Sequence, residues 1–132
     1  MPPIRLLLFS QFQHIEASLR AAIRSDPELI LMARAASLPA TLSAYAAWTP
    51  DVVVSDVYSA PVDVVQRIRG YFPAVKLLVC GPSGADARDM LRAGVVGYLL
   101  CDSAPVEMIG ALRSVYAGNV AVSLGLTRAL LG

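Results

Sequence analysis

The chain contains 132 residues, of which eleven are Lys or Arg and ten are Asp or Glu, so its formal net charge is +1. This length fits a single domain with an ordinary core, and the balanced charge, without a basic run, argues against a surface that grips nucleic-acid phosphates. Hydrophobic residues make up 56% of the chain, but no run approaches the roughly 18 apolar residues of a membrane helix. The N-terminal residues lack a signal-peptide layout, so we expect a cytoplasmic protein without a membrane partner.

Five short apolar segments are predicted to be strands. They are bounded by polar or turn residues and read as continuous apolar runs, which are typical of strands buried on both faces of a parallel sheet. In chain order they cover residues 4–9, 29–33, 50–56, 76–80 and 97–100. The third ends at Asp56, a lone carboxylate directly after three valines and a serine.

Helices are predicted between and after these strands, from apolar residues at helical spacing. They cover residues 15–23, about 40–48, 62–71, 85–93 and a last segment between Ser103 and Gly118. We expect Ser10 and Ser103 to cap the first and last helices, and Gly94 to end the fourth in the left-handed conformation. The inner stripe of the last helix is predicted to be Val106, Ile109, Leu112 and Tyr116.

The alternation of strands and helices predicts a doubly wound α/β domain, with a parallel sheet covered by helices on both faces. In such a sheet the carboxyl ends of the strands form the ligand-binding crevice. The residues expected at that edge are Ser10, Asp56, Gly81 and Cys101. From the residues alone, this is a pocket with one carboxylate.

Several segments also follow a known family pattern in order and spacing, above all the string Ala93-Gly94-Val95-Val96-Gly97-Tyr98-Leu99-Leu100. With these motifs the chain resembles a response-regulator receiver domain of the NarL/FixJ class of transcription regulators. The resemblance implies a flavodoxin-like (CheY-like) fold with a five-stranded parallel sheet of order 2-1-3-4-5 and five helices. It also implies a receiver domain over residues 1–122 and the start of a C-terminal linker or extra helix over 123–132, with the DNA-binding domain outside this chain.

The resemblance further implies that Asp56 occupies the phosphoacceptor position. Receivers place two acidic residues after the first strand to hold Mg²⁺, a Thr or Ser after the fourth strand, and a Lys after the fifth. In this chain those positions read Ser10 and Gln11, then Gly81 (or Cys80 if the register slips), then Cys101. Tyr98 keeps the position of the switch aromatic.

These departures matter because phosphoryl transfer to a carboxylate depends on positioning and on neutralisation of charge by metal and cationic groups. Mg²⁺ is usually held by one or two carboxylates, and here Asp56 stands nearly alone. We therefore expect no cofactor, no firm Mg²⁺ site and no sensor-kinase partner. We expect the pocket to be held instead by hydrogen bonds from Ser10 and Gln11.

The predicted function is that of a phosphorylation-independent receiver domain of a two-component-type transcription regulator. It would act by homodimerisation or by controlling an attached helix-turn-helix domain, with no direct nucleic-acid contact of its own. Two alternatives stay open, namely a functional phosphoreceiver that uses Asp56 and a small-ligand-sensing pseudo-receiver. An enzyme is not expected, because no base, nucleophile pair or metal cluster converges on the strand ends.

A few further residues admit a structural interpretation. Cys80 and Cys101 have apolar neighbours and no visible base, which favours buried packing cysteines over a reactive pair. His14 is expected on the surface. Met108 and Arg113 on the last helix are candidates for a dimer interface.

Overall fold

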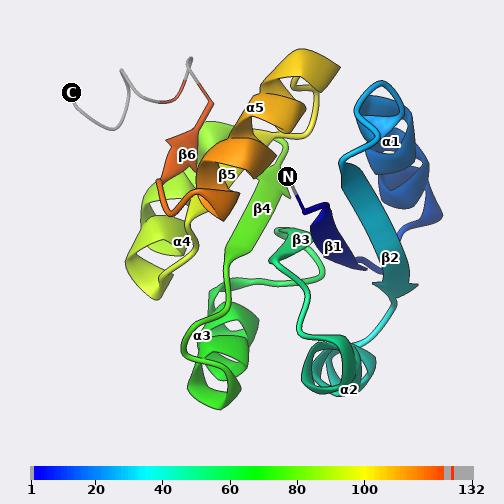
Figure 1. Cartoon of the computed structure of the whole chain (residues 1–132). Coiled ribbons are helices and arrows are strands. Elements are labelled where there is room, and N and C mark those ends of the chain that lie inside the picture. The colour runs from blue at the N-terminus through cyan, green and yellow to red at the C-terminus, as the bar shows by residue number, and fades with distance from the viewer. Residues whose placement is uncertain (1, 124–125, 127–132) are drawn as a thin grey trace.

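The computed structural model describes residues 2–123 and 126, and its centre is one parallel sheet (Figure 1). Six strands follow the spatial order β2-β1-β3-β4-β5-β6, and every neighbouring pair is parallel. The strands are β1 Ile4–Phe9, β2 Leu29–Ala35, β3 Val52–Asp56, β4 Leu77–Gly81, β5 Gly97–Leu100 and β6 Ala121–Val122. The central strands β3 and β4 are buried along their whole length, as their continuous apolar runs predicted.

Helices cover both faces of this sheet (Figure 1). They are α1 Gln13–Ile23, α2 Leu38–Trp48, α3 Val62–Tyr71, α4 Ala87–Ala93 and α5 Pro105–Tyr116, with a short 3₁₀ turn, Gly84–Asp86, before α4. Helices α1 and α5 pack on one face, and α2, α3 and α4 pack on the other. The doubly wound architecture is therefore confirmed.

Alternate residues of the strands point into two separate apolar cores, one on each face of the sheet. On β1, Leu7 and Phe9 point into the core under α2, α3 and α4, whereas Leu6 and Leu8 point into the core under α1 and α5. This follows from the two-residue period of a strand, which sends neighbouring side chains to opposite faces. Both cores are needed to bury a sheet whose two faces are apolar.

The expected five-stranded sheet is wrong by one strand. β6 pairs with β5 through Gly97 opposite Ala121 and Tyr98 opposite Val122. It has two residues, and β-strand periodicity cannot be recognised in a segment that short. The other strand predictions hold within two residues at each end, with β2 running on to Ala35 and β4 to Gly81.

The predicted serine caps are also wrong. Helix α1 begins after Phe12 and α5 after Ala104, and neither of these residues makes a side-chain cap. Ser10 lies two residues before the N-cap of α1, where its hydroxyl bonds elsewhere, as described below. By contrast, Gly94 does end α4, with φ of 105°, and Ser37 caps α2 by accepting from the Ala40 N–H.

The inner face of α5 differs from the predicted stripe. Its buried residues are Ala111, Leu112 and Val115, whereas Val106 has an exposed fraction of 78%. Of the predicted stripe, Leu112 is fully buried, and Ile109 and Tyr116 are partly buried against the same core. Only Val106 is wrong, because the first turn of the helix extends beyond the core.

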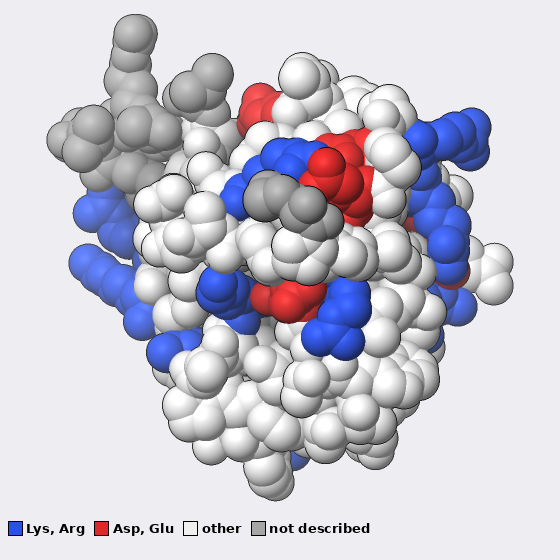
Figure 2. All heavy atoms as spheres, viewed as in Figure 1, with Lys and Arg blue, Asp and Glu red and all other residues white. Residues whose placement is uncertain are grey.

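The charged surface is mixed on the side of the molecule seen in Figure 2. Basic side chains lie next to acidic ones, and neutral side chains cover most of the remaining area (Figure 2). Within residues 2–123 and 126, no helix is long and apolar enough to cross a membrane. Of the expected linker at 123–132, only Ser123 and Leu126 fall within the described residues, and both are buried.

Candidate functional site

Asp56 ends β3 at the carboxyl edge of the sheet, with β1 on one side and β4 on the other. Its side chain is almost fully buried, since only 1% of the residue is exposed. The β4 residue paired with Asp56 is Cys80, and Gly81 lies one position further along. Cys80 is therefore the β4 residue directly beside Asp56, and Gly81 is the last residue of that strand.

Both oxygens of the Asp56 carboxylate are engaged by two donors each. Oδ2 accepts from the hydroxyls of Ser10 at 2.8 Å and Ser59 at 2.9 Å. Oδ1 accepts from the backbone N–H groups of Tyr58 at 3.1 Å and Ser59 at 2.9 Å. All four donors are neutral, so they satisfy the carboxylate without cancelling its charge.

The same serines tie the Asp56 carboxylate to the loop after β1. The Ser10 hydroxyl oxygen accepts from the Phe12 N–H at 3.1 Å, and the Ser59 hydroxyl oxygen accepts from the Gln11 N–H at 3.0 Å. Gln11 therefore contributes its backbone, through Ser59, and its side chain is exposed. The expected hydrogen bond from Ser10 is present, but that from the Gln11 side chain to the carboxylate is not.

Ser59 was missed by the sequence reasoning. An aspartate side chain often accepts hydrogen bonds from the backbone N–H groups that follow it in a turn. From this preference the backbone of residues 58 and 59 could have been predicted near the carboxylate. The hydrogen bond from the Ser59 hydroxyl could be assigned only from the loop conformation, because a serine three residues after an aspartate can point in any direction until the turn is known.

No cation neutralises Asp56 in the described part of the chain. None of the ion pairs formed by these residues includes it. Arg34, on β2, donates to the backbone carbonyl of Ser10 at 3.0 Å and pairs with Glu16. Among residues 2–123 and 126, no group of three His, Cys, Asp or Glu side chains could hold a metal ion.

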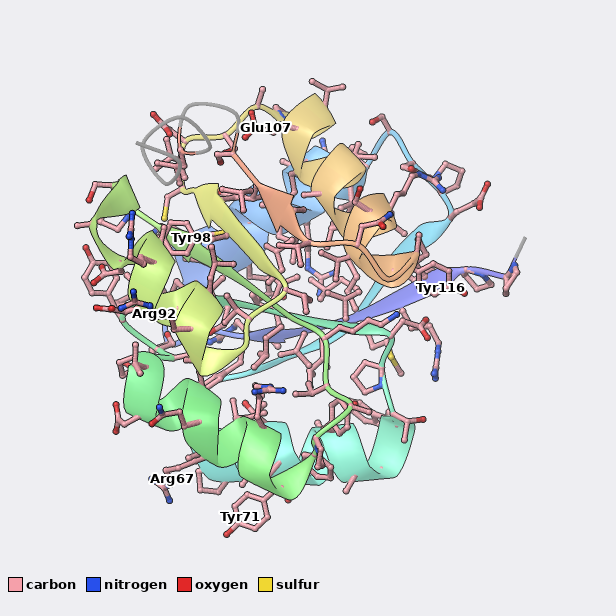
Figure 3. The ribbon with its side chains drawn as sticks, turned by 90° about the vertical axis from the view of Figure 1, so that its left-hand side faces the viewer. Arg67, Tyr71, Arg92, Tyr98, Glu107 and Tyr116 are labelled. Carbon is pink, nitrogen blue, oxygen red and sulfur yellow. The ribbon has the colours of Figure 1, made fainter. Side chains whose placement is uncertain are left out.

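Tyr98 is fully buried and lies against Gly81, in the core on the α4 side of the sheet (Figure 3). Its hydroxyl donates to the Ser83 carbonyl at 2.8 Å, and burial, followed by the charge of Asp86, raises the pKa of Tyr98 to about 12. A Cβ atom at Gly81 would overlap the Tyr98 hydroxyl and lie 2.8 Å from Cζ. The aromatic ring can therefore occupy this inward position because residue 81 has no side chain.

A cavity of about 330 Å³ opens from Asp56 between α1 and α5. Its lining includes both cysteines. Cys80 is buried, and this burial, with smaller contributions from Cys101 and Asp56, raises the pKa of its thiol to about 12. Cys101 is exposed, contrary to the prediction of a buried packing residue, yet partial burial of its thiol and the charges of Asp56 and Asp102 raise its pKa.

Two of the three remaining candidate residues line this cavity. His14 is exposed, as predicted, but lies at the cavity lining. Met108 also lines the cavity. Arg113 donates to Asp26 through two nitrogens, at 2.6 and 3.1 Å, so it ties α5 to the turn before β2.

Comparison with known proteins gives one curated relative and many solved structures. No family model matches the chain. The oxygen regulatory protein NreC of Staphylococcus epidermidis is 31% identical over 88 residues, which are 62% of this chain and 40% of that protein. The chain therefore spans well under two thirds of this relative's length.

Solved structures match over nearly the whole chain. A two-component response regulator of the LuxR family from Aurantimonas sp. superposes with a TM-score of 0.88 and 25% identity, covering 98% of this chain and 96% of that one. A structure of two RcsB dimers bound to two parallel DNAs superposes with a TM-score of 0.85 and 14% identity, covering 98% of this chain and 68% of that one. The second similarity concerns the fold alone.

The parallel sheet with helices on both faces, and an aspartate at the carboxyl end of its third strand, define the receiver fold. The chain has the receiver fold and is similar over nearly its whole length to a LuxR-family two-component response regulator, in agreement with the family resemblance of its motifs. The relatives are named as regulators and not as enzymes.

Proposed function

We propose that this receiver works without phosphorylation of Asp56 and controls an attached DNA-binding domain, or its own dimerisation, through a fixed conformation. The observation that carries the proposal is the saturation of the Asp56 carboxylate by four neutral hydrogen-bond donors. The resting pocket is thus satisfied without a metal ion or a lysine. Nothing in it stores the like-charge repulsion that metal binding relieves in an acidic pocket.

Phosphorylation would have to undo this arrangement. A phosphoryl group on Oδ2 would displace the Ser10 and Ser59 hydroxyls, which each also accept a backbone N–H. Among the described residues, no cation is paired with Asp56 to neutralise the incoming dianionic group, although charge neutralisation supplies most of the catalysis in phosphoryl transfer. A pocket built this way favours the unmodified aspartate.

Tyr98 supports a fixed output state. In the receivers that the chain resembles, phosphorylation draws the hydroxyl after the fourth strand inward and the aromatic of the fifth strand follows. Here Tyr98 is already buried against the α4 side of the sheet, bonded to the Ser83 carbonyl, with Gly81 leaving room for it. The inward state therefore needs no phosphoryl group to hold it.

The proposed output is supported by the relatives rather than by a feature of this chain. The RcsB structure described above contains dimers on DNA, and the NreC relative extends well beyond the matched region. We infer a receiver over residues 1–122, followed by a linker or extra helix from 123 that leads to a helix-turn-helix domain. Contact with DNA would belong to that domain, in keeping with the mixed charges seen in Figure 2.

The test is intact-mass analysis after incubation with acetyl phosphate, with and without Mg²⁺, on the chain and on Asp56→Asn. We expect no phosphoryl adduct on either protein. An adduct that needs Mg²⁺ and is lost in Asp56→Asn would instead establish a functional phosphoreceiver. Sedimentation of the untreated chain over a range of concentrations tests dimerisation separately, and a monomer throughout would leave control of an attached domain as the output.

A further inference from the structure

We propose that the cavity between α1 and α5 is a binding site for a small organic cation, an amine with an apolar body. The proposal goes beyond the function given above, because it concerns which molecule enters the pocket and not whether Asp56 is phosphorylated. It rests on three features of the cavity, namely its apolar walls, its single buried charge and the aromatic side chains at its lining.

The walls suit an apolar body. Helix α1 contributes Ile15, Leu19 and Ala22, strand β3 contributes Val54, and α5 contributes Met108. The volume of about 330 Å³ lies in the range of small-molecule sites, which are typically apolar with a few placed polar groups. Hydrated Mg²⁺ would be a poor occupant, because this ion needs a shell of oxygen ligands and these wall side chains are apolar.

Asp56 supplies the negative charge of the cavity. Among the described residues that line it, Asp56 is the only Asp or Glu, none is Lys or Arg, and the one titratable nitrogen is that of His14, at the exposed end. The four hydrogen bonds to Asp56 come from neutral groups, and the raised pKa values of Cys80 and Cys101 keep both thiols uncharged at neutral pH. A buried charge without a counterion is unfavourable, so a bound cation would offset a cost already present in the free protein.

Aromatic side chains favour the same ligand. Phe12 and Tyr58 both line the cavity and meet edge to face, with ring centroids 6.2 Å apart and an interplanar angle of 87°. His14 lies against Phe12 with centroids 5.6 Å apart. Aromatic faces attract ammonium groups through their quadrupole, and Tyr58 is 64% exposed, so its ring is accessible to an entering ligand. An anion would be repelled by Asp56, and a neutral ligand would leave its charge uncompensated.

The test compares three probes of similar shape and different charge. These are 2-phenylethylamine, 2-phenylethanol and 3-phenylpropionate, titrated calorimetrically into the full chain. We expect the amine to bind at least about tenfold more tightly than the alcohol, a difference of about 1.4 kcal/mol, and the carboxylate not to bind. In Asp56→Asn the affinity for the amine should fall to that for the alcohol. Asp63 is an exposed carboxylate of α3 on the other face of the sheet, so the control variant Asp63→Asn should bind the amine with wild-type affinity.

A second variant tests the location. Ser18 is an exposed residue of α1 that lines the cavity, so Ser18→Trp should fill the cavity without disturbing the core and should abolish amine binding. Circular dichroism checks that both variants remain folded. Three results would overturn the proposal. They are equal affinities for the amine and the alcohol, unchanged amine binding in Asp56→Asn or in Ser18→Trp, and no binding of any probe. None of these outcomes bears on phosphorylation, which the intact-mass experiment decides independently.

Discussion

The Ser10 hydroxyl donates to Oδ2 of Asp56 over 2.8 Å, and the same oxygen accepts the Phe12 N–H. One small side chain thus links the end of β1, the start of α1 and the end of β3. An acidic residue at this position would place a second negative charge against Asp56. Serine supplies a hydrogen-bond donor instead and adds no charge, so the like-charge repulsion is absent while the charge of Asp56 itself stays without a counterion.

Removal of either hydroxyl should destabilise the fold. Ser10→Ala and Ser59→Ala each take one donor from the buried Oδ2 and leave one backbone N–H without its acceptor. We expect each change to lower the free energy of unfolding by about 1 to 2 kcal/mol, measured by urea denaturation with an unchanged m-value. Ser43→Ala, on the exposed side of α2, is the control and should lie within about 0.5 kcal/mol of wild type. Equal stabilities for all three variants would contradict the network.

Gly81 and Tyr98 should prove to be energetically coupled. Gly81→Ala places a Cβ atom against the Tyr98 ring and hydroxyl, and such overpacking costs about 1 to 3 kcal/mol. Tyr98→Phe removes the bond to the Ser83 carbonyl, at about 0.5 to 1.5 kcal/mol, and also removes the overlapping oxygen. The double variant should therefore be more stable than the sum of the two changes allows. Strictly additive losses in the free energy of unfolding would show that the side chain at residue 81 does not interact with the Tyr98 ring.

Magnesium should not stabilise the wild-type chain. Its melting temperature is expected to stay constant up to millimolar Mg²⁺, because a ligand raises stability only when it binds the folded state. The double variant Ser10→Asp, Gln11→Asp adds two carboxylates where receivers hold the ion, and it should melt lower without metal and gain stability with it. Adding Asp56→Asn to this variant should reduce the gain. A wild-type response as large as that of the double variant would mean that Asp56 holds the ion without an acidic pair.

The two cysteines should react very differently with iodoacetamide. Cys101 is exposed and should be alkylated in the native protein, whereas Cys80 is buried with a pKa of about 12 and should react only on unfolding. The thiolate is the reactive form, and the pKa of Cys101 is raised, so its rate should climb at a higher pH than that of a free cysteine. Asp102→Asn removes one of the charges that raise this pKa and should shift the rate profile towards lower pH. Peptide mass mapping of the alkylated sites at a series of pH values provides the measurement.

The sequence by itself determined the doubly wound architecture and the position of Asp56. Continuous apolar runs such as Val52–Val54 identify strands buried on both faces, and their alternation with helical patterns admits few topologies. The helix Val62–Tyr71 was predicted correctly, and apolar residues at helical spacing, Val65 and Ile68, form its buried side. The aspartate that ends the third apolar run had to reach the ligand edge of such a sheet.

Only the tertiary structure decided how that edge is used. Whether Cys80 or Gly81 faces Asp56 depends on strand register, and the sequence leaves this open because both residues end the same apolar run. The roles of Ser10 and Ser59 depend on loop conformation, since a hydroxyl can equally cap a helix or bond a carboxylate. How far the apolar face of α5 is buried was also decided by packing, since Val106 has the spacing of the inner stripe but is exposed. Long-range packing chooses among such locally equivalent options, and in this chain it leaves a buried charge beside an apolar cavity.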